Sequence, residues 1–146
     1  MKINIGKTEL IHFVGIGGIG MSGLALIMDS LGFKIQGSDK SDNKNLNLLR
    51  KRKIPIYLNH NKQNIKNCTV LVVSSAIKKS NPEYRHAKKL NIPIYKRGEL
   101  LGHIVSLMKN IVVTGSHGKT TTTSILSNIM NYAKLDPTII NGVVLN

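Results

Sequence analysis

An α/β fold built on a doubly wound parallel sheet is predicted for most of this 146-residue chain. Short apolar runs alternate with segments of helical periodicity, an order that is typical of parallel sheets with helices on both faces. Two glycine-rich loops, at residues 15–20 and 115–121, each follow an apolar run and lead into a predicted helix. Because backbone N–H groups at the start of a helix bind phosphates, the sequence predicts two sites for phosphorylated ligands.

Strands and helices alternate through the first 109 residues. The segment 19–31 places apolar side chains at helical spacing and ends before Gly32, a residue that suits the end of a helix. The β-branched run 70–73 predicts a strand that is covered on both faces. We expect strands at 10–14, 33–37, 54–57, 70–73 and 92–95, and helices at 19–31, 45–53, 82–90 and 99–108.

A second domain is predicted to begin at residue 110. The run 111–114 is expected to form a strand, followed by a phosphate loop, a helix at 120–133 and one more strand. Only 37 residues follow Lys109, which is too few to enclose a hydrophobic core. The predicted organisation is a complete domain at 1–109 and the truncated start of a P-loop domain at 110–146, in a truncated protein or a fragment.

The composition is strongly basic, with 21 Lys and Arg against 7 Asp and Glu and a formal net charge of +14. The basic residues are scattered, and two Phe, four Tyr and no Trp leave few side chains for stacking on bases. A solvated basic surface is therefore preferred over nucleic-acid binding. No apolar run approaches the ~20 residues that cross a bilayer, no secretory leader is recognised, and Cys68 is the only cysteine. We expect a cytoplasmic protein without disulfides and without a nucleic-acid or membrane partner.

The first glycine-rich loop has the Gly-x-Gly-x-x-Gly spacing of dinucleotide sites, formed by Gly15, Gly17 and Gly20. The missing side chains let the backbone turn tightly and approach a diphosphate. Asp39 follows the last glycine by 19 residues, where a carboxylate can accept hydrogen bonds from a ribose or a base. His12, in the preceding strand, is interpreted as a packed residue. By itself this pattern favours NAD or FAD over other diphosphates, and an ordinary glycine turn is the alternative.

The second glycine-rich loop, at residues 114–121, has the parts of a P-loop but not its usual spacing. The usual form has four residues between its first glycine and Gly-Lys-Thr, and here that first position holds Val113. Lys119 can neutralise phosphate charge, and the hydroxyl of Thr120 can bind magnesium. His117 is either a further donor near the nucleotide or a loop residue that faces solvent. The alternative is a glycine-capped turn with a solvated lysine.

Six stretches carry a further pattern, at residues 11–23, 37–39, 73–77, 81–83, 97–101 and 114–122. Together they resemble the Mur ligase family. That family uses the same shortened P-loop, although Ser116 stands here where threonine is usual. His117, placed before Gly-Lys-Thr, favours the alanine-adding branch of the family or its tripeptide-recycling relative. Of these two, the Gly-Ile-Gly-Gly-Ile-Gly-Met-Ser sequence at 15–22 favours the alanine-adding branch.

The resemblance implies a three-domain ligase of peptidoglycan precursor synthesis, which serves cell wall formation, cell shape and cell division. Its first domain, although Rossmann-like, would bind UDP-N-acetylmuramate rather than NAD. Its central P-loop domain would bind ATP and Mg²⁺. ATP would phosphorylate the muramoyl carboxylate, and the amine of L-alanine would then attack the acyl phosphate to form an amide with loss of phosphate.

The resemblance also implies the residues of both sites. Lys119 and Thr120 would be catalytic, with Thr120 as a magnesium ligand. His60 is a weaker candidate for the UDP site, because it follows Asn59 where the family often has glycine. The UDP substrate would bind Gly15, Gly17, Gly18, Ile19, Gly20, Ser22, Asp39, Ser74, Ser75 and Ala76, and ATP would bind Gly115, Ser116, His117, Gly118, Lys119, Thr120 and Thr121.

Three other interpretations remain open from the sequence. An NAD(P)-binding oxidoreductase domain explains the first loop but leaves the second without a role. A nucleotide-sensing or nucleic-acid-binding module would account for the charge, and a non-catalytic remnant would account for the length. The family's other magnesium ligands and its third domain have no counterpart in these 146 residues. We therefore expect this chain alone to lack ligase activity.

Overall fold

A computed structural model describes residues 5–141 of the chain. The chain divides into two compact units, of which the first ends at Met108 and the second begins at Lys109. Among residues 5–141, no helix is both long enough and apolar enough to cross a membrane.

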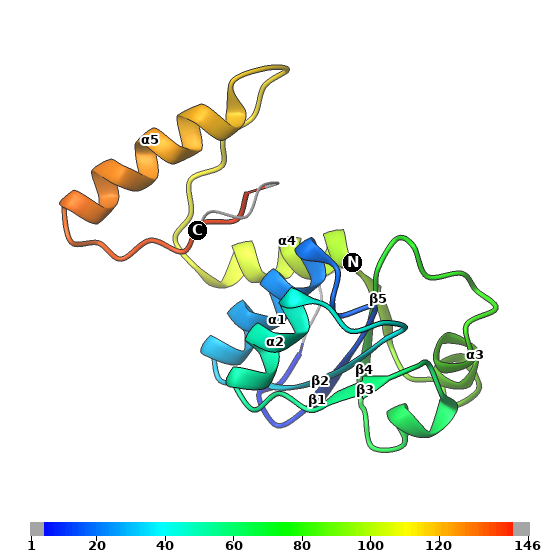
Figure 1. Cartoon of the computed structure of the whole chain (residues 1–146). Helices are drawn as coiled ribbons and strands as arrows, with labels where there is room; N and C mark the ends of the chain where they lie inside the picture. Colours follow the sequence, from blue (N-terminus) through cyan, green and yellow to red (C-terminus); the bar gives the residue numbers. More distant parts are fainter. Residues whose placement is uncertain (1–4, 142–146) are drawn as a thin grey trace. The chain divides into compact units, whose positions relative to one another are not determined.

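The first unit is built on a five-stranded sheet in which all strands are parallel (Figure 1). Strand β1 lies at the centre between β2 and β4, and β3 and β5 form the two edges. The predicted doubly wound parallel sheet is confirmed. The strand order changes direction between β1 and β4, the kind of switch point at which open α/β sheets bind ligands. The strands are β1 (Leu10–Val14), β2 (Lys34–Asp39), β3 (Ile56–Leu58), β4 (Val70–Val73) and β5 (Ile94–Lys96).

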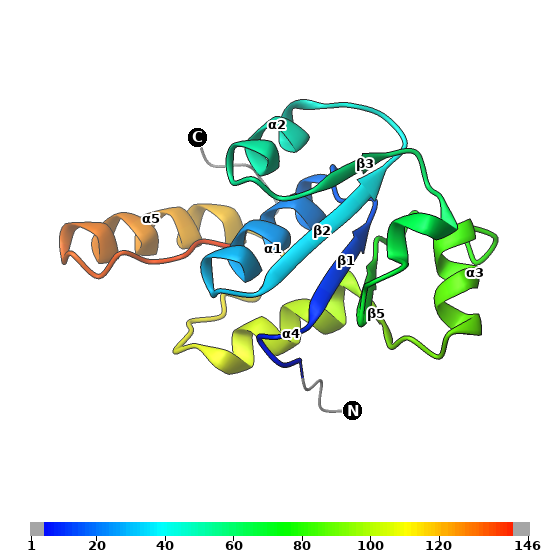
Figure 2. The same cartoon turned by 90° about the horizontal axis from the view of Figure 1, so that it is seen from below.

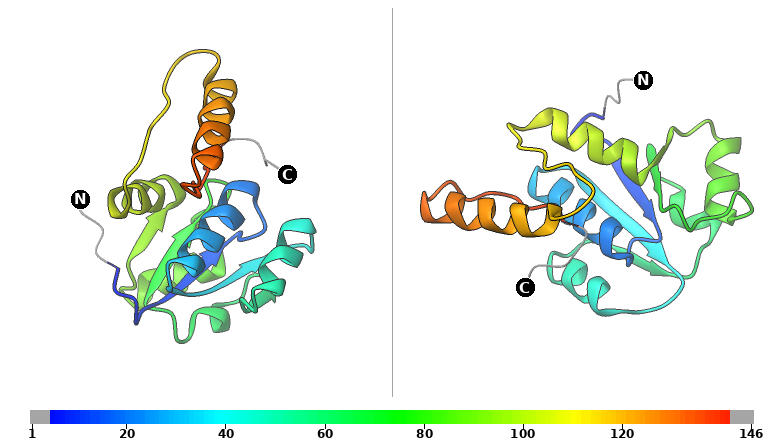
Figure 3. Two further views of the ribbon diagram at one scale, coloured as in Figure 1. Left: turned by 90° about the vertical axis from the view of Figure 1, so that its left-hand side faces the viewer. Right: turned by 90° about the horizontal axis from the view of Figure 1, so that it is seen from above.

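Helices cover both faces of this sheet (Figures 2 and 3). Helices α1, α2 and α4 pack over the larger apolar cluster, whereas α3 and the 3-10 helix η1 cover a smaller cluster on the opposite face. Successive residues of a strand point to opposite faces, so Phe13 belongs to the larger cluster and Val14 to the smaller one. The helices are α1 (Ile19–Ser30), α2 (Lys44–Lys51), η1 (Lys62–Ile65), α3 (Pro82–Lys89) and α4 (Arg97–Leu107).

The predicted bounds of the strands at 10–14 and 70–73 are confirmed, and the ends of the other predicted elements of the first unit differ from the observed ones by at most two residues. Both edge strands begin after a proline, because proline has no N–H to donate to the ladder. The carbonyl of each proline still accepts a hydrogen bond, from Gly37 N–H to Pro55 at 3.0 Å and from Leu71 N–H to Pro93 at 2.9 Å. Helix η1 was not predicted, because a single turn has no amphipathic period.

The second unit contains one helix, α5 (Lys119–Tyr132), within its described residues 109–141. The predicted helix at 120–133 is confirmed with a shift of one residue. The predicted strand at 111–114 is wrong: these residues form no strand, and Ile111 and Val112 are 63% and 66% exposed. A strand needs a neighbour to pair with its N–H and C=O groups, and residues 109–141 contain no other strand. The final predicted strand is not formed up to residue 141, and its remainder lies outside the described residues.

Gly37 marks a close approach between β2 and the first loop. A Cβ at this position would lie 2.5 Å from Ile16 Cδ1 and 2.7 Å from the carbonyl oxygen of Phe13. Ile16 is fully buried, and the carbonyl belongs to the backbone of β1. Neither neighbour can move away easily, so the turn after β1 packs on the sheet only because position 37 has no side chain.

Replacement of Gly37 by alanine is expected to lower the free energy of unfolding by about 1–3 kcal/mol, because the methyl group overpacks this region. Gly23→Ala is the matched control, since an added Cβ within α1 would meet nothing within 4 Å. Alanine favours helices, so the control should be neutral or stabilising by up to about 1 kcal/mol. Urea denaturation followed by circular dichroism measures both variants. Equal stability of the two would contradict the close approach.

Candidate functional site

The predicted residues of the first site gather at the carboxyl edge of the sheet. The glycine-rich loop follows β1, Asp39 ends β2, and residues 74–76 follow β4. These three strands are neighbours, so their carboxyl ends meet at one place. An added Cβ on Gly17 would lie 2.9 Å from Asp39 Oδ2, and one on Gly15 would lie 3.3 Å from Ser74 Cβ. The structure thus brings Gly15, Gly17, Asp39 and Ser74 together.

The backbone of the loop leaves two N–H groups without a partner among the described residues. Gly15 is left-handed at a φ of 79°, and the N–H groups of Gly15 and Ile16 both donate to the carbonyl of Ser38, at 2.8 and 3.0 Å. Helix α1 then starts without a side-chain cap. The N–H groups of Ile19 and Gly20 have no acceptor within residues 5–141. Free N–H groups and the helix dipole together favour an anion at this point.

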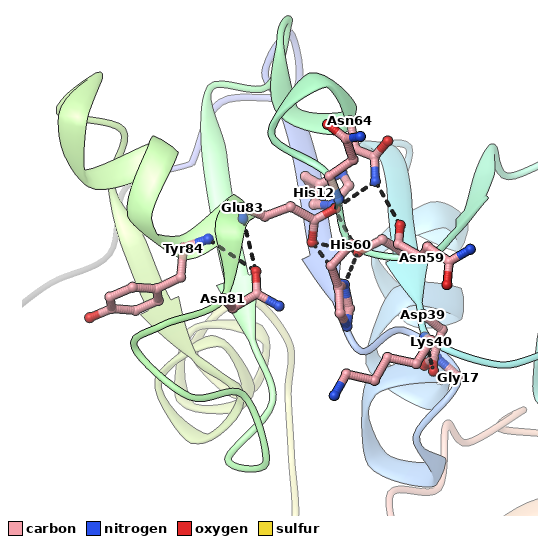
Figure 4. A network of polar contacts seen from close by, with 12 residues as sticks. His12, Gly17, Asp39, Lys40, Asn59, His60, Asn64, Asn81, Glu83 and Tyr84 are labelled. Carbon is pink, nitrogen blue, oxygen red and sulfur yellow. Dashed lines mark hydrogen bonds and ion pairs between the residues drawn. The ribbon is translucent and has the colours of Figure 1, made fainter.

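Asp39 connects the loop to the end of β2 (Figure 4). Its Oδ2 accepts a hydrogen bond from Gly17 N–H at 2.8 Å, and its Oδ1 accepts one from Lys40 N–H at 2.8 Å. The side chain of Asn45 donates to the carbonyl of Gly17 at 2.7 Å. Gly17 is therefore held through both its N–H and its carbonyl. Each oxygen of Asp39 keeps lone pairs that can accept hydrogen bonds from a ligand hydroxyl.

Three of the predicted residues have a less direct relation to the loop. Ser75 and Ala76 are exposed in the turn after β4, where the N–H of Ala76 donates to Ser74 Oγ at 3.3 Å. Ser22 is buried in α1, and its hydroxyl donates to the carbonyl of Ile19 at 3.1 Å. In this structure the hydroxyl of Ser22 therefore stabilises the first turn of the helix.

A buried polar cluster that was not predicted lies on the face of the sheet covered by α3 and η1 (Figure 4). Strand alternation places His12 of β1 and Ser38 of β2 on this face, and the first turn of α3 places Glu83 beside them. Asn81 caps α3 by accepting from the N–H of Glu83 at 2.9 Å. We call this cluster the Glu83 network, and its members are His12, Gln36, Ser38, His60, Asn64 and Glu83.

Glu83 is fully buried at the centre of this network. Ser38 Oγ donates to its Oε2 at 2.6 Å, and Asn64 Nδ2 donates to its Oε1 at 2.6 Å. His60 Nδ1 lies 3.0 Å from Oε2, and His12 Nε2 lies 3.6 Å from Oε1. Burial raises the pKa of Glu83, but hydrogen bonds from His12, Ser38 and Asn64 outweigh burial and lower the pKa below its usual 4.5. The carboxylate is therefore ionised at neutral pH.

Gln36 orients the ring of His12 within the network. Its amide Nε2 donates to His12 Nδ1 at 3.1 Å and to the carbonyl of Asn64 at 2.9 Å. The hydroxyl of Tyr57 donates to Gln36 Oε1 at 3.5 Å, which fits this orientation of the amide. Because His12 Nδ1 accepts, the proton of the neutral ring resides on Nε2, the atom that faces Glu83.

The sequence contained only part of the signal for the Glu83 network. The helix predicted at 82–90 begins at Pro82 as expected, and Asn81 is its N-cap. The burial of Glu83 has no local signal, because its partner Ser38 lies 45 residues earlier. His12 is fully buried, as interpreted. His60, the weaker candidate for the UDP site, contacts Ser38 Oγ at 2.9 Å from within the network.

The second glycine-rich loop, in the second unit, leads directly into helix α5. Gly118 caps α5 in the left-handed conformation, with a φ of 75°, and the helix begins at Lys119. The ammonium of Lys119 donates to the carbonyls of Gly115 at 2.5 Å and Ser116 at 3.2 Å. The lysine therefore closes the loop on itself.

The remaining groups of this loop fit a phosphate chain. Residues 114–121 are all exposed, His117 included. The N–H groups of Thr120 and Thr121 have no acceptor within residues 5–141, and they lie at the start of α5. No group of three or more His, Cys, Asp or Glu in the described part of the chain could hold a metal ion.

Residues 10–109, which carry the sheet and the first loop, match the sequence model of the Mur ligase family, catalytic domain. The chain belongs to the Mur ligase family. Over all 146 residues it is 66% identical to the UDP-N-acetylmuramate--L-alanine ligase of Pelagibacter ubique and 44% identical to the ligase of that name from Brucella ovis. It spans 32% and 30% of the lengths of these relatives, about a third. The resemblance found in the sequence is confirmed.

Two solved structures share the fold. One is a UDP-N-acetylmuramate-alanine ligase from Thermotoga maritima, with a TM-score of 0.84 and 34% identity, over 94% of this chain and 32% of that one. The other is a UDP-N-acetylmuramate:L-alanyl-gamma-D-glutamyl-meso-diaminopimelate ligase from Neisseria meningitides, with a TM-score of 0.82 and 29% identity, over 93% of this chain and 43% of that one. The Rossmann-like α/β class is thereby confirmed.

The lowered pKa of Glu83 leads to an expected pH dependence of stability. Its folded-state pKa lies below the usual 4.5, so the carboxylate contributes stability above pH 4.5 that is lost as the pH falls through the lowered value. Glu83→Gln should lower the free energy of unfolding at pH 7 by about 1–3 kcal/mol. It should also remove the part of the stability loss at low pH that comes from protonation of Glu83. Urea denaturation from pH 7 to about pH 3 measures both effects.

The exposed Glu99 provides the control for this experiment, as Glu99→Gln. The amide oxygen of glutamine can still accept the hydrogen bond from Lys96 N–H that Glu99 accepts at 2.6 Å. This variant should have the same free energy of unfolding at pH 7 as the unaltered chain, and should lose the same amount of stability as the pH falls. If Glu83→Gln behaved like Glu99→Gln, the Glu83 network would not stabilise the fold as described.

Proposed function

We propose that this chain is the N-terminal part of an ATP-dependent ligase that joins L-alanine to UDP-N-acetylmuramate in peptidoglycan precursor synthesis. The observation that carries the proposal is the identity of the whole chain to relatives that bear this name. Since the chain spans about a third of those relatives, we assign it part of the active site rather than the complete reaction. The reaction would take place in the cytoplasm.

Residues 1–109 would bind the UDP part of the substrate. The N–H groups of Ile19 and Gly20 support this role, because they have no acceptor within residues 5–141 and N–H groups at a helix start favour an anion. Asp39 would accept hydrogen bonds from the ribose or the base next to the loop that it holds. Ser74, together with the exposed turn at 75–76, would border the same ligand from the end of β4.

Residues 110–146 would form the beginning of the domain that binds Mg-ATP. Lys119 would exchange its bonds to the carbonyls of Gly115 and Ser116 for bonds to phosphate oxygens. The hydroxyl of Thr120 would bind magnesium, and both groups would act by positioning and charge neutralisation rather than by covalent chemistry. The phosphoryl group would pass to the muramoyl carboxylate, and the amine of L-alanine would displace phosphate from the acyl phosphate.

An NAD(P)-linked oxidoreductase is the alternative that the glycine spacing alone leaves open. It is not favoured, because the similar proteins of known kind are ligases. It also gives no role to the second loop, whose lysine and free N–H groups fit a phosphate chain.

Calorimetry should show binding of UDP-N-acetylmuramate to this chain and no binding of NADH. Gly17→Ala should weaken the affinity about tenfold, the effect of losing roughly one hydrogen bond. The added methyl group would lie 2.9 Å from Asp39 Oδ2 and 2.5 Å from Asn43 Nδ2, and would displace the loop. Gly23→Ala, on the open side of α1, is the control and should bind like the unaltered chain. Tighter binding of NADH than of UDP-N-acetylmuramate would favour the oxidoreductase.

These 146 residues alone should not turn over the proposed substrates, because they span only about a third of the length of the relatives that bear this name. ADP release is measured with UDP-N-acetylmuramate, L-alanine and Mg-ATP together, and with each omitted in turn. ADP release no faster than in the absence of protein is the expected result. Turnover that requires all three substrates would show that these residues form a complete active site.

A further inference from the structure

Arg97 lies against the first loop, although it is not among the residues assigned to the UDP site from the sequence. It is the first residue of α4 and directly follows edge strand β5, at the same carboxyl edge of the sheet as the loop. An added Cβ on Gly20 would collide with Arg97 Nη1 and would lie 3.2 Å from its Cδ and Cζ. The guanidinium group therefore lies over the first turn of α1.

The guanidinium group of Arg97 has no partner among residues 5–141. The side chain is exposed, and no hydrogen bond or ion pair joins it to another described residue. The carboxylate of Glu99, in the same helical turn, accepts from Lys96 N–H at 2.6 Å instead. Asp39, the acid at the loop, accepts from Gly17 N–H. The charge of Arg97 is thus available to a ligand.

Two positive groups meet at this point of the structure. The N-terminus of a helix carries about half a positive charge, so a cation beside it is unfavourable. The N–H groups of Ile19 and Gly20, which contribute to that charge, have no acceptor within residues 5–141. An anion between α1 and Arg97 would accept hydrogen bonds from both sides and replace this repulsion with attraction. Backbone donors on one helix and a side-chain donor on another define a divided anion site.

We propose that Arg97 is a diphosphate-binding residue that acts together with the N–H groups of Ile19 and Gly20. This inference rests on the proposed function, because it deepens the binding of a UDP substrate at the first loop. A guanidinium group binds two phosphate oxygens at once, which the point charge of lysine does not. A diphosphate offers oxygens on two phosphorus atoms, one group for the N–H groups of Ile19 and Gly20 and one for Arg97. Arg97 would therefore strengthen the binding of nucleoside diphosphates more than that of monophosphates, and would not affect uncharged nucleosides.

The placement of Arg97 also gives Gly20 a specific role. In dinucleotide-binding loops the third glycine usually permits close packing of the helix on a strand. Here an added Cβ on Gly20 would meet the end of a flexible arginine side chain rather than a strand. Glycine at this position leaves the space that the guanidinium group needs to reach the free N–H groups.

The test compares the affinities of UDP, UMP and uridine for four forms of the full chain by calorimetry: unaltered, Arg97→Ala, Arg97→Lys and Arg85→Ala. Arg85 is the matched control, because it is an exposed arginine on α3 and its replacement removes the same charge. Arg97→Ala should weaken the binding of UDP about 10- to 100-fold, which is the scale of a bidentate charged contact. It should weaken the binding of UMP less. Uridine binding should not change. The UDP affinity of Arg97→Lys should lie between those of Arg97→Ala and the unaltered chain. The UDP affinity of Arg85→Ala should stay within about twofold of that of the unaltered chain.

A double-mutant cycle with Gly20→Ala tests the placement itself. The methyl group should displace the guanidinium group without weakening the fold, because alanine favours helices. We expect UDP affinity to fall about three- to tenfold in the unaltered chain and less than twofold when Arg97 is already alanine. Equal effects in both backgrounds would show that the guanidinium group does not occupy the space over Gly20.

The outcomes separate this inference from the function on which it rests. If UDP binds the unaltered chain and Arg97→Ala equally, the role of Arg97 is overturned and the UDP site stands. The same follows if Arg97→Ala weakens the binding of uridine as much as the binding of UDP. If the unaltered chain binds none of the uridine compounds, the proposed function is overturned, and inorganic pyrophosphate becomes the probe. Pyrophosphate binding that Arg97→Ala weakens and Arg85→Ala does not would support the anion site. If pyrophosphate does not bind in this way, the anion site is overturned as well. Circular dichroism verifies the fold of each variant.

Discussion

Two hydrogen bonds to the carbonyl of Ser38 determine the path of the first loop. The N–H groups of Gly15 and Ile16 both donate to this oxygen, so the chain leaving β1 is anchored on the end of the neighbouring strand. The left-handed conformation of Gly15 and the close approach at Gly37 both belong to this turn. These first N–H groups are used inside the protein, whereas those of the next turn, at Ile19 and Gly20, have no acceptor within residues 5–141.

The same serine joins the loop to the opposite face of the sheet. While the carbonyl of Ser38 holds the loop, its hydroxyl donates to Glu83 at 2.6 Å. The N–H of Asn59 donates to the carbonyl of Asp39 at 2.7 Å, and the side chain of Asn64 donates to the carbonyl of Asn59 at 3.0 Å. A buried carboxylate is costly unless it is fully hydrogen-bonded, and here its partners come from several elements. The Glu83 network therefore fixes the carboxyl edge of the sheet from the face covered by α3 and η1, and none of its members belongs to the first loop.

The sequence predicted what depends on local signals and missed what the topology brings together. The run 70–73, the helical period of 19–31 and the glycine spacing before α1 are each visible in a short window, and the structure contains all three. The contacts of Glu83 and Arg97 are not visible in such a window. Glu83 meets a strand residue 45 positions earlier, and Arg97 meets Gly20 only because β5 and β1 end at the same edge. The sequence shows an acidic residue, Glu83, and a basic residue, Arg97, near the starts of two helices. Only the order of the strands shows which residues these two side chains contact.

The two glycine-rich loops differ in what holds them. The first is anchored by hydrogen bonds that its N–H groups donate to Ser38 and Asp39, which lie on another strand. The second lacks such a partner within residues 109–141, because the strand expected before it is not formed, and the ammonium of Lys119 bonds to the carbonyls of its own loop. Gly118 and the helix that it caps are encoded locally, so α5 forms where it was predicted. A strand is stable only when it pairs, so the same stretch of sequence can specify a glycine-capped helix start and still leave the strand before it unformed.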